Sequence, residues 1–301
     1  MDDMNLTEQT AAHFAVEFTS IADDDRDLGP LEMHAYLFAQ RTGIDPGLWA
    51  EAAANPQPTV PGTTPDLSWL HGKRVLDAGC GPGRFTVVAA QVAQSVVALD
   101  IGDHLERART RCERYALDNV EFVRGSVLDP PLEEASFDFV FSIGVLHHTP
   151  DPRGGVHALS RLLKPGGTLA VAVYPPAYWP PGIRGVVARA IHRRVSRMSP
   201  EASLRLCRRY LYPLGRLQMR LARRRWTKLL GAPLFLVNVP RHDPPEVMLG
   251  TIHDYYGPPI ITTHTFEELE GWLAEAGLDV ERLPVPTSAR GKRPAEAVGG
   301  E

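Results

Sequence analysis

An acid followed by alternating glycines is the feature of this chain with the clearest chemical meaning. Residues 75–86 read Val-Leu-Asp-Ala-Gly-Cys-Gly-Pro-Gly-Arg-Phe-Thr, so Asp77 is followed by Gly79, Gly81 and Gly83. Glycines are needed where a backbone turns sharply or lets a ligand come close. A dinucleotide-binding fingerprint, G-x-G-x-x-G, would need its third glycine one position after Gly83, where this chain has arginine. Asp77 therefore indicates a ligand that presents a cation or a donor in place of a pyrophosphate.

Apolar segments are expected to form the strands that position these residues. The run 75–78 predicts a buried strand that leads into a tight turn and then a helix. The next apolar run, 95–100, ends at Asp100, 23 residues after Asp77. An acid at the tip of the second strand suits the two hydroxyls of a ribose. Its alternative role is to cap the helix that follows.

Two further strands follow in the same order along the chain. Residues 120–124 predict the third strand, and Ser126 stands two positions after it. Residues 137–142 predict the fourth strand. Gly144 follows two positions later and would let the backbone approach a ligand at that strand end.

This succession of motifs resembles the class I S-adenosylmethionine-dependent methyltransferases, most densely over residues 72–174. The resemblance implies an α/β fold with a seven-stranded, doubly wound, mainly parallel sheet of the Rossmann-like type and an antiparallel last strand. The implied cofactor is S-adenosyl-L-methionine. The residues implied to bind it are Asp77, Gly79, Gly81, Gly83, Asp100, Ile101, Ser126, Val127, Ser142 and Gly144.

One position departs from the family pattern. The family commonly has an acid where this chain has Ser126, and that acid accepts a hydrogen bond from the adenine amino group. In this chain the adenine contact passes to backbone groups, to the Ser126 hydroxyl or to Asp129, and the sequence leaves these alternatives open.

Histidines are the candidates for proton transfer, because their pKa lies near neutral pH. His147 and His148 follow the fourth strand within a phrase, 142–152, that resembles the small-molecule branch of the family. His148 is favoured over His147 as the base, and the alternative is that one of them caps the following turn. His253 is a third candidate, because Asp254 could orient it, although a packed loop explains that segment equally well.

The chain is expected to have four parts. Residues 1–70 predict a helical N-terminal lid and connector, 71–174 the cofactor-binding core, and 175–260 a basic helical insert that caps the substrate. Residues 261–301 predict a helix over 265–277 that begins with a Thr-x-x-Glu capping box, then a strand over 278–285 that completes the core, and a polar tail.

The composition indicates the class of protein and its compartment in the cell. A length of 301 residues with 44% hydrophobic residues is enough for one core with additions. The three cysteines have no metal-ligand spacing, so no metal site is predicted. An odd cysteine count without a signal-peptide pattern predicts a cytoplasmic protein. No apolar stretch approaches the length of a membrane span.

The insert carries an unusual charge. Residues 181–228 contain 14 Lys and Arg and one acid, a local formal charge of +13 in a chain of net charge −4. Apolar residues at helical spacing predict two or three amphipathic helices in this segment. The basic face could be solvated and docked on the acidic remainder, could bind an anionic or amphiphilic substrate, or could touch a membrane surface peripherally. The acidic overall balance disfavours nucleic acid.

Together these features predict a methyltransferase that acts on a small-molecule or lipid-like metabolite, with O-methylation favoured. One alternative is an RNA or protein methyltransferase that uses the basic insert to follow a polymer. The other is a catalytically silent cofactor-binding scaffold, against which the intact glycine loop and the paired histidines argue.

Overall fold

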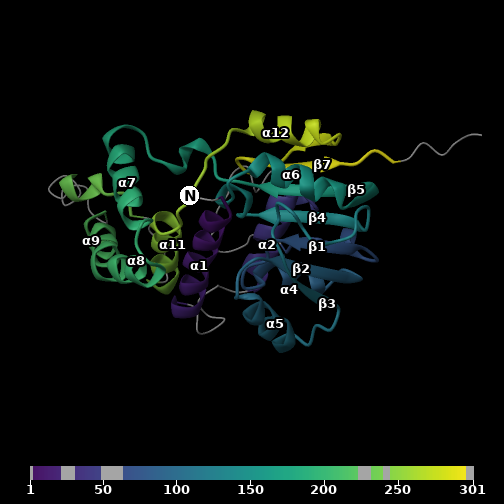
Figure 1. Cartoon of the computed structure of the whole chain (residues 1–301), viewed down its shortest axis with the longest axis horizontal. Helices are drawn as coiled ribbons and strands as arrows, with labels where there is room; N and C mark the ends of the chain where they lie inside the picture. The colour runs from purple at the N-terminus through teal and green to yellow at the C-terminus, as the bar shows by residue number, and fades with distance from the viewer. Residues whose placement is uncertain (1–2, 22–30, 49–63, 223–231, 240–244, 296–301) are drawn as a thin grey trace, which may run out of the picture. The chain divides into compact units, whose positions relative to one another are not determined.

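The computed structural model of the chain describes residues 3–21, 31–48, 64–222, 232–239 and 245–295, and the chain forms two compact units (Figure 1). The helical unit comprises Met1–Leu28 and Pro176–Ile261. The sheet unit comprises Gly29–Pro175 and Thr262–Glu301. The segment 1–70 is therefore divided between the two units.

Seven strands of the sheet unit form one sheet in the order β3-β2-β1-β4-β5-β7-β6. The strands are β1 Arg74–Ala78, β2 Ser95–Asp100, β3 Val120–Arg124, β4 Phe137–Ile143, β5 Leu163–Ala172, β6 Asp279–Arg282 and β7 Ser288–Lys292. Neighbours from β3 to β5 pair in parallel, whereas β7 is antiparallel to both β5 and β6. The predicted mainly parallel, doubly wound sheet of seven strands is confirmed.

The end of the chain differs from the sequence prediction. A polar tail was expected after residue 285, but Ser288–Lys292 forms β7 and lies inside the sheet between β5 and β6. Ser288 and Ala289 are small enough to be fully buried there. Arg290 donates to the Glu281 carboxylate and to the Gly43 carbonyl, each at 2.6 Å, so its charge is neutralised on the neighbouring strand.

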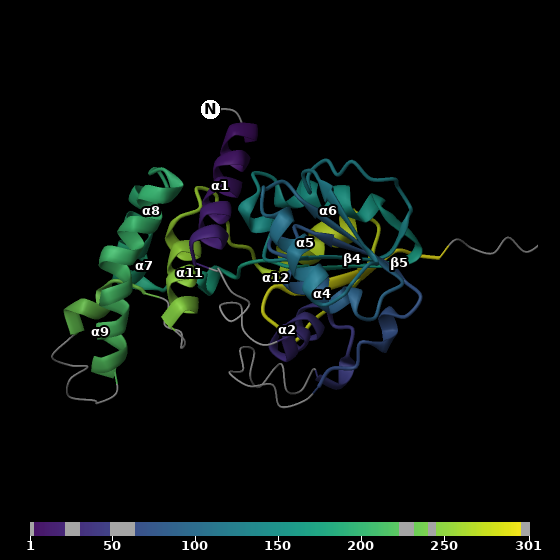
Figure 2. The same cartoon turned by 90° about the horizontal axis from the view of Figure 1, so that it is seen from below.

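Helices cover the sheet (Figure 2), and alternating side chains of the strands divide the apolar residues between its two faces. Val75, Phe139 and Phe141 pack in one cluster with helices α2 (Leu31–Thr42) and α4 (Arg84–Ala90). Leu76 and Val140 pack in the other cluster with α6 (Pro152–Arg161) and α12 (Phe266–Glu275). Helix α5 (Leu105–Arg114) contacts α4 and buries Ala108 against Ala98 of β2. Burial on both faces makes the central strands almost wholly apolar.

Local signals fix the helix ends as the sequence predicted. The Thr265 hydroxyl accepts from the Glu268 N–H at 3.2 Å, and the Glu268 carboxylate accepts from the Thr265 N–H at 2.8 Å. This reciprocal pair is the predicted capping box at the start of α12. Ser199 caps the helix that begins at Pro200 by a single hydrogen bond, which its hydroxyl accepts from the Ala202 N–H at 3.3 Å.

The helical unit contains the predicted amphipathic helices and buries its own core. Its helices are α1 Asp3–Ile21, α7 Gly182–Val195, α8 Pro200–Leu206, α9 Tyr212–Ala222 and α11 Pro245–Tyr256, with a π-helical turn, Cys207–Leu211, between α8 and α9. Helix α1 packs on α8 and α11. The basic residues of 223–228 lie outside the described residues. Within the described ranges, no helix has the length and apolar character needed to cross a membrane.

Candidate active site

The predicted cofactor residues meet at one edge of the sheet, because the parallel strands β1, β2 and β4 all end there. The loop after β1 is fixed to β2 by the N–H groups of Gly79 and Cys80, which both donate to the Leu99 carbonyl at 2.8 and 3.0 Å. Gly79 has φ +89°, and a Cβ atom there would lie 2.4 Å from the Val145 side chain. Only glycine fits that turn.

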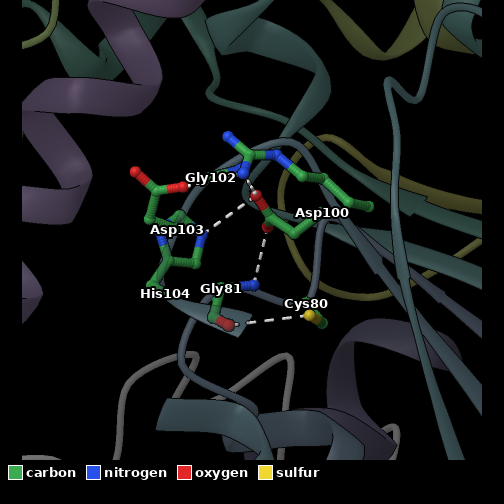
Figure 3. Close-up of polar contacts among 7 residues, drawn as sticks. Cys80, Gly81, Asp100, Gly102, Asp103 and His104 are labelled. Carbon is green, nitrogen blue, oxygen red and sulfur yellow. Dashed lines mark hydrogen bonds and ion pairs between the residues drawn. The ribbon is translucent and has the colours of Figure 1, made fainter. Parts of the chain in front are cut away.

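Asp100 connects the two loops of this site (Figure 3). One carboxylate oxygen, Oδ2, accepts from the Gly81 N–H at 2.8 Å. The other, Oδ1, accepts from the Gly102 N–H and from the Nε2 atom of His104, each at 2.9 Å. Asp100 thus holds both loops in place, in addition to its predicted role in binding a ribose.

The charge of Asp100 is held by these same contacts. Burial by itself would raise the pKa of the carboxyl, but the hydrogen bonds and charge of His104 and the N–H groups of Gly102 and Gly81 outweigh it and lower the pKa. Asp100 is therefore a carboxylate at neutral pH. Sequence reasoning missed His104; its signal was a histidine four positions after a strand-end acid.

Asp77 has a different environment at the end of β1. Its side chain is buried, and among the described residues its carboxyl group accepts one hydrogen bond, from the Thr86 hydroxyl at 2.7 Å. Burial and then the charge of Asp100 raise the pKa of Asp77 to about 7, against the lowering effects of Thr86 and Arg84. Asp100 is therefore ionised at neutral pH, whereas Asp77 gains or loses its proton in that range.

We expect Asp77→Asn to make folding stability less dependent on pH. The folded carboxyl keeps its proton up to about pH 7, whereas the unfolded one loses it near 3.8, so the wild type loses stability as pH rises through this window. Over two pH units of this window, the free energy of unfolding of the wild type should fall by roughly 2–3 kcal/mol. Asp77→Asn should not show this fall. Urea unfolding at pH 5 and pH 8 measures the difference. Asp138→Asn is the control of opposite sign, because Lys164 and the Arg74 N–H help to hold the pKa of Asp138 low; equal pH slopes for Asp77→Asn and the wild type would contradict the expectation.

The remaining predicted cofactor residues lie on the same edge. The Ser142 hydroxyl donates to the Ala78 carbonyl at 2.9 Å, so it ties β4 to β1. Gly144 has φ +79°, and no atom of the described residues lies within 4 Å of a Cβ atom built on it. Ser126 Oγ accepts from the Leu128 N–H at 3.1 Å and thereby shapes the loop after β3. Ile101 is half-buried and Val127 is buried.

His147 and His148 form one turn of 3₁₀ helix after β4, beside Tyr174. The His147 ring stacks on Tyr174 with centroids 3.6 Å apart, and the His148 ring lies 4.3 Å from that of His147. His147 is fully buried, and neither of its ring nitrogens has a hydrogen-bond partner within the described residues. Burial, followed by the charges of His148, His264 and Arg41, lowers the pKa of His147 well below its usual value. The ring is therefore neutral at pH 7.

His253 belongs to the helical unit, whereas His147 and His148 belong to the sheet unit. It lies in α11, fully buried, with Nδ1 3.0 Å from the Glu17 carboxylate and Nε2 2.8 Å from the Ser203 hydroxyl. The carboxylate in contact with His253 is thus Glu17, and the predicted Asp254 acts on the pKa of His253 through its charge. A catalytic role for His253 stays a prediction.

Arg41 on α2 adds a cation that the sequence analysis did not select. Burial and the charge of Arg84 lower the pKa of this guanidinium, while Tyr174 acts in the opposite direction. No acid of the described residues forms an ion pair with Arg41. Arg41 lies 36 positions before Asp77 in the chain, so no local sequence pattern connects the two residues. Only the packing of α2 on α4 and β5 brings Arg41 to this edge.

Part of the chain is similar to known proteins. Residues 76–171 match the family described as "Methyltransferase domain". The chain is 34% identical over 140 residues to an uncharacterized protein of Synechococcus sp., covering 40% of this chain and 34% of that protein. It is 38% identical over 100 residues to the ubiquinone biosynthesis O-methyltransferase of Salmonella arizonae, covering 33% of this chain and 41% of that protein. A solved S-adenosylmethionine-dependent methyltransferase from Mesorhizobium loti is 30% identical, with a TM-score of 0.34 and coverage of 37% of this chain and 51% of that one.

With their sheet order and glycine loop, residues 76–171 form a class I S-adenosylmethionine-dependent methyltransferase domain, and the predicted class is confirmed for this part of the chain. The aligned part spans 34–42% of the length of the curated relatives that it matches. The family match falls on residues 76–171, which belong to the sheet unit, so it does not cover the helical unit.

Proposed function

We propose that the chain transfers a methyl group from S-adenosylmethionine to a hydroxyl oxygen of a small organic acceptor. The observation that carries this proposal is the cradle at the edge of β1, β2 and β4, in which Asp100 joins two loops and Gly144 leaves open space beside them. The similarity to ubiquinone biosynthesis O-methyltransferases supports an oxygen acceptor.

The residues of the cradle fit the chemical groups of this cofactor. Asp77 and Asp100 provide negative charge for an ammonium, a sulfonium and ribose hydroxyls, and Arg41 provides positive charge for a carboxylate. An Asp77 pKa of about 7 implies that a cationic ligand binds the ionised form and displaces a proton near neutral pH. When bound, the cofactor supplies a methyl group on sulfur, and a neutral sulfide is the leaving group.

The protein's part in this reaction is alignment and proton transfer. We assign His147 to the acceptor hydroxyl, because a buried ring with two unpaired nitrogens carries a desolvation cost that a ligand would remove. A neutral imidazole can accept the hydroxyl hydrogen bond and orient the oxygen for in-line attack. As the O–CH₃ bond forms, the proton on that oxygen becomes strongly acidic, so even a base of lowered pKa takes it. His148, favoured by the sequence, stays the alternative base.

A direct test uses the full chain and labelled cofactor. Calorimetry should show binding of S-adenosylhomocysteine and no comparable binding of NADH. Cell extracts that contain the acceptor should gain label in a small-molecule fraction, with or without prior RNase treatment. Label confined to RNA or protein, or cofactor binding without any turnover, would contradict the proposal and favour one of the two alternatives.

Arg41→Met should weaken binding of S-adenosylhomocysteine by roughly tenfold to a hundredfold, because a hydrogen bond between charged groups would be lost. 5′-Methylthioadenosine lacks the amino-acid part of the cofactor, so its affinity should not change. Calorimetry with the two ligands on the same two proteins measures both effects. A loss of affinity for both ligands would show that Arg41 supports the fold of the site and does not bind a carboxylate.

The acceptor is proposed to be a small molecule, and the cytoplasmic location stays a prediction from the cysteine content. All three cysteines are free and buried. Peripheral membrane contact through 181–228 is also untested, and its last residues lie outside the described part of the chain.

A further inference from the structure

A groove of about 530 Å³ lies within the helical unit. It is bordered by the C-terminal half of α7, by Leu6 and Gln9 of α1, by Trp179 and by the segment that contains Pro259 and Ile261. Its size is that of a site for a small organic molecule. Every residue that lines it belongs to one unit, so the groove exists independently of the edge of the sheet.

One wall of the groove is strongly cationic. Arg189, Arg193 and Arg197 are spaced by four residues and line it together. All three are exposed, and no described acid forms an ion pair with any of them. Like charges at this spacing destabilise a helix, although the C-terminal end of a helix favours cations. A dianion placed among the three guanidiniums would remove their repulsion.

The other surface of the groove is aromatic and apolar. The edge of the Trp179 ring packs against His192 and Tyr255, with centroids 5.4 and 5.1 Å apart. His192 Nε2 donates to the Pro258 carbonyl at 2.9 Å, and burial lowers the pKa of this histidine. The imidazole is therefore neutral at pH 7, and the positive charge of the groove comes from the arginines alone. Trp179, Leu6 and Ile261 offer a flat or aliphatic group a fixed surface.

We propose that this groove binds a phosphomonoester that carries an aromatic or short aliphatic group. A phosphate dianion matches three guanidiniums better than a single carboxylate does, and arginine binds phosphate oxygens in a bidentate manner. The proposal does not depend on methyl transfer, and it identifies a ligand site that the methyltransferase cradle does not use.

The test uses phenyl phosphate as the probe and calorimetry of the full chain. Phenyl phosphate should bind, and benzyl alcohol should not. The affinity should fall steeply from about 0.01 M to about 0.15 M salt, where the Debye length shrinks from ~30 Å to ~8 Å. Arg193→Gln should weaken binding by roughly tenfold or more, and Arg193→Lys should restore part of it. Arg194→Gln is the matched control, because Arg194 is an exposed arginine of α7 that does not line the groove.

Three results would overturn the proposal. The first is a parent protein that does not bind phenyl phosphate at low salt. The second is an equal effect of Arg193→Gln and Arg194→Gln, which would indicate a general charge effect. The third is binding to phosphatidic acid vesicles, and not to phosphatidylcholine vesicles or phenyl phosphate, which would assign the arginines to a lipid surface. S-Adenosylhomocysteine binding, measured on the same samples, reports separately on the methyltransferase site.

Discussion

Replacing His147 with alanine should lower kcat by about 10²- to 10⁴-fold, the usual contribution of a positioned proton acceptor. The affinity for S-adenosylhomocysteine should stay the same, since the ring is assigned to the acceptor and not to the cofactor. The reaction is followed with labelled S-adenosylmethionine and the acceptor recovered from the extract screen. Folding is checked by circular dichroism, because the variant also loses the stacking of the ring on Tyr174.

The pH profile distinguishes a proton acceptor from a residue that only packs. Because the pKa of His147 lies well below its usual value, the free base is present throughout pH 6.5–8. At saturating cofactor, titration of His147 should therefore not make kcat fall around pH 6.5 as the pH is lowered. His157→Ala is the matched control, as His157 lies on α6 with a partly exposed ring 3.7 Å from Glu275. An unchanged kcat in His147→Ala, with a large loss in His148→Ala, would assign the base to His148.

Gly144→Ala should weaken binding of S-adenosylhomocysteine by roughly tenfold to a hundredfold, the effect of overfilling a packed site by 1–3 kcal/mol. The added methyl group would enter the open space beside the carboxyl end of β4. If the amino-acid part of the cofactor occupies that space, the methyl group and the ligand compete for it. Calorimetry of the two proteins measures the difference directly and requires no acceptor.

Gly166→Ala provides a closely matched control for this prediction. Gly166 also has φ +79°, also has no described atom within 4 Å of an added Cβ, and also donates its N–H to a backbone carbonyl. Both variants therefore carry the same cost of about 1–2 kcal/mol for an alanine in the left-handed region. The cradle is supported if the two variants lose equal stability but only Gly144→Ala loses affinity for S-adenosylhomocysteine. Full affinity in Gly144→Ala would show that the ligand does not approach this glycine.

The sequence by itself determined that the predicted cofactor residues lie at one edge of the sheet. Each strand ends near a residue with few alternatives: Asp77 at the end of β1 with its glycines beyond, Asp100 as the last residue of β2, and Gly144 after β4. Apolar runs fix the strands, and the carboxyl ends of parallel strands meet at one edge, so short-range patterns were enough to place these residues together. The capping box at the start of α12 was predictable for the same reason, since its two residues are three positions apart.

Only the tertiary structure decided the contacts between distant segments. Helix packing places Arg41 near His147, and antiparallel pairing draws Ser288–Lys292 into the sheet, although that segment reads as a polar tail. The fold also gives Asp100 three donors from two loops, raises the pKa of Asp77 by burial, and places Arg189 and Arg193 of α7 along one groove with Arg197, which follows that helix. Burial and long-range partners determine these properties, and neither is encoded in the spacing of neighbouring residues.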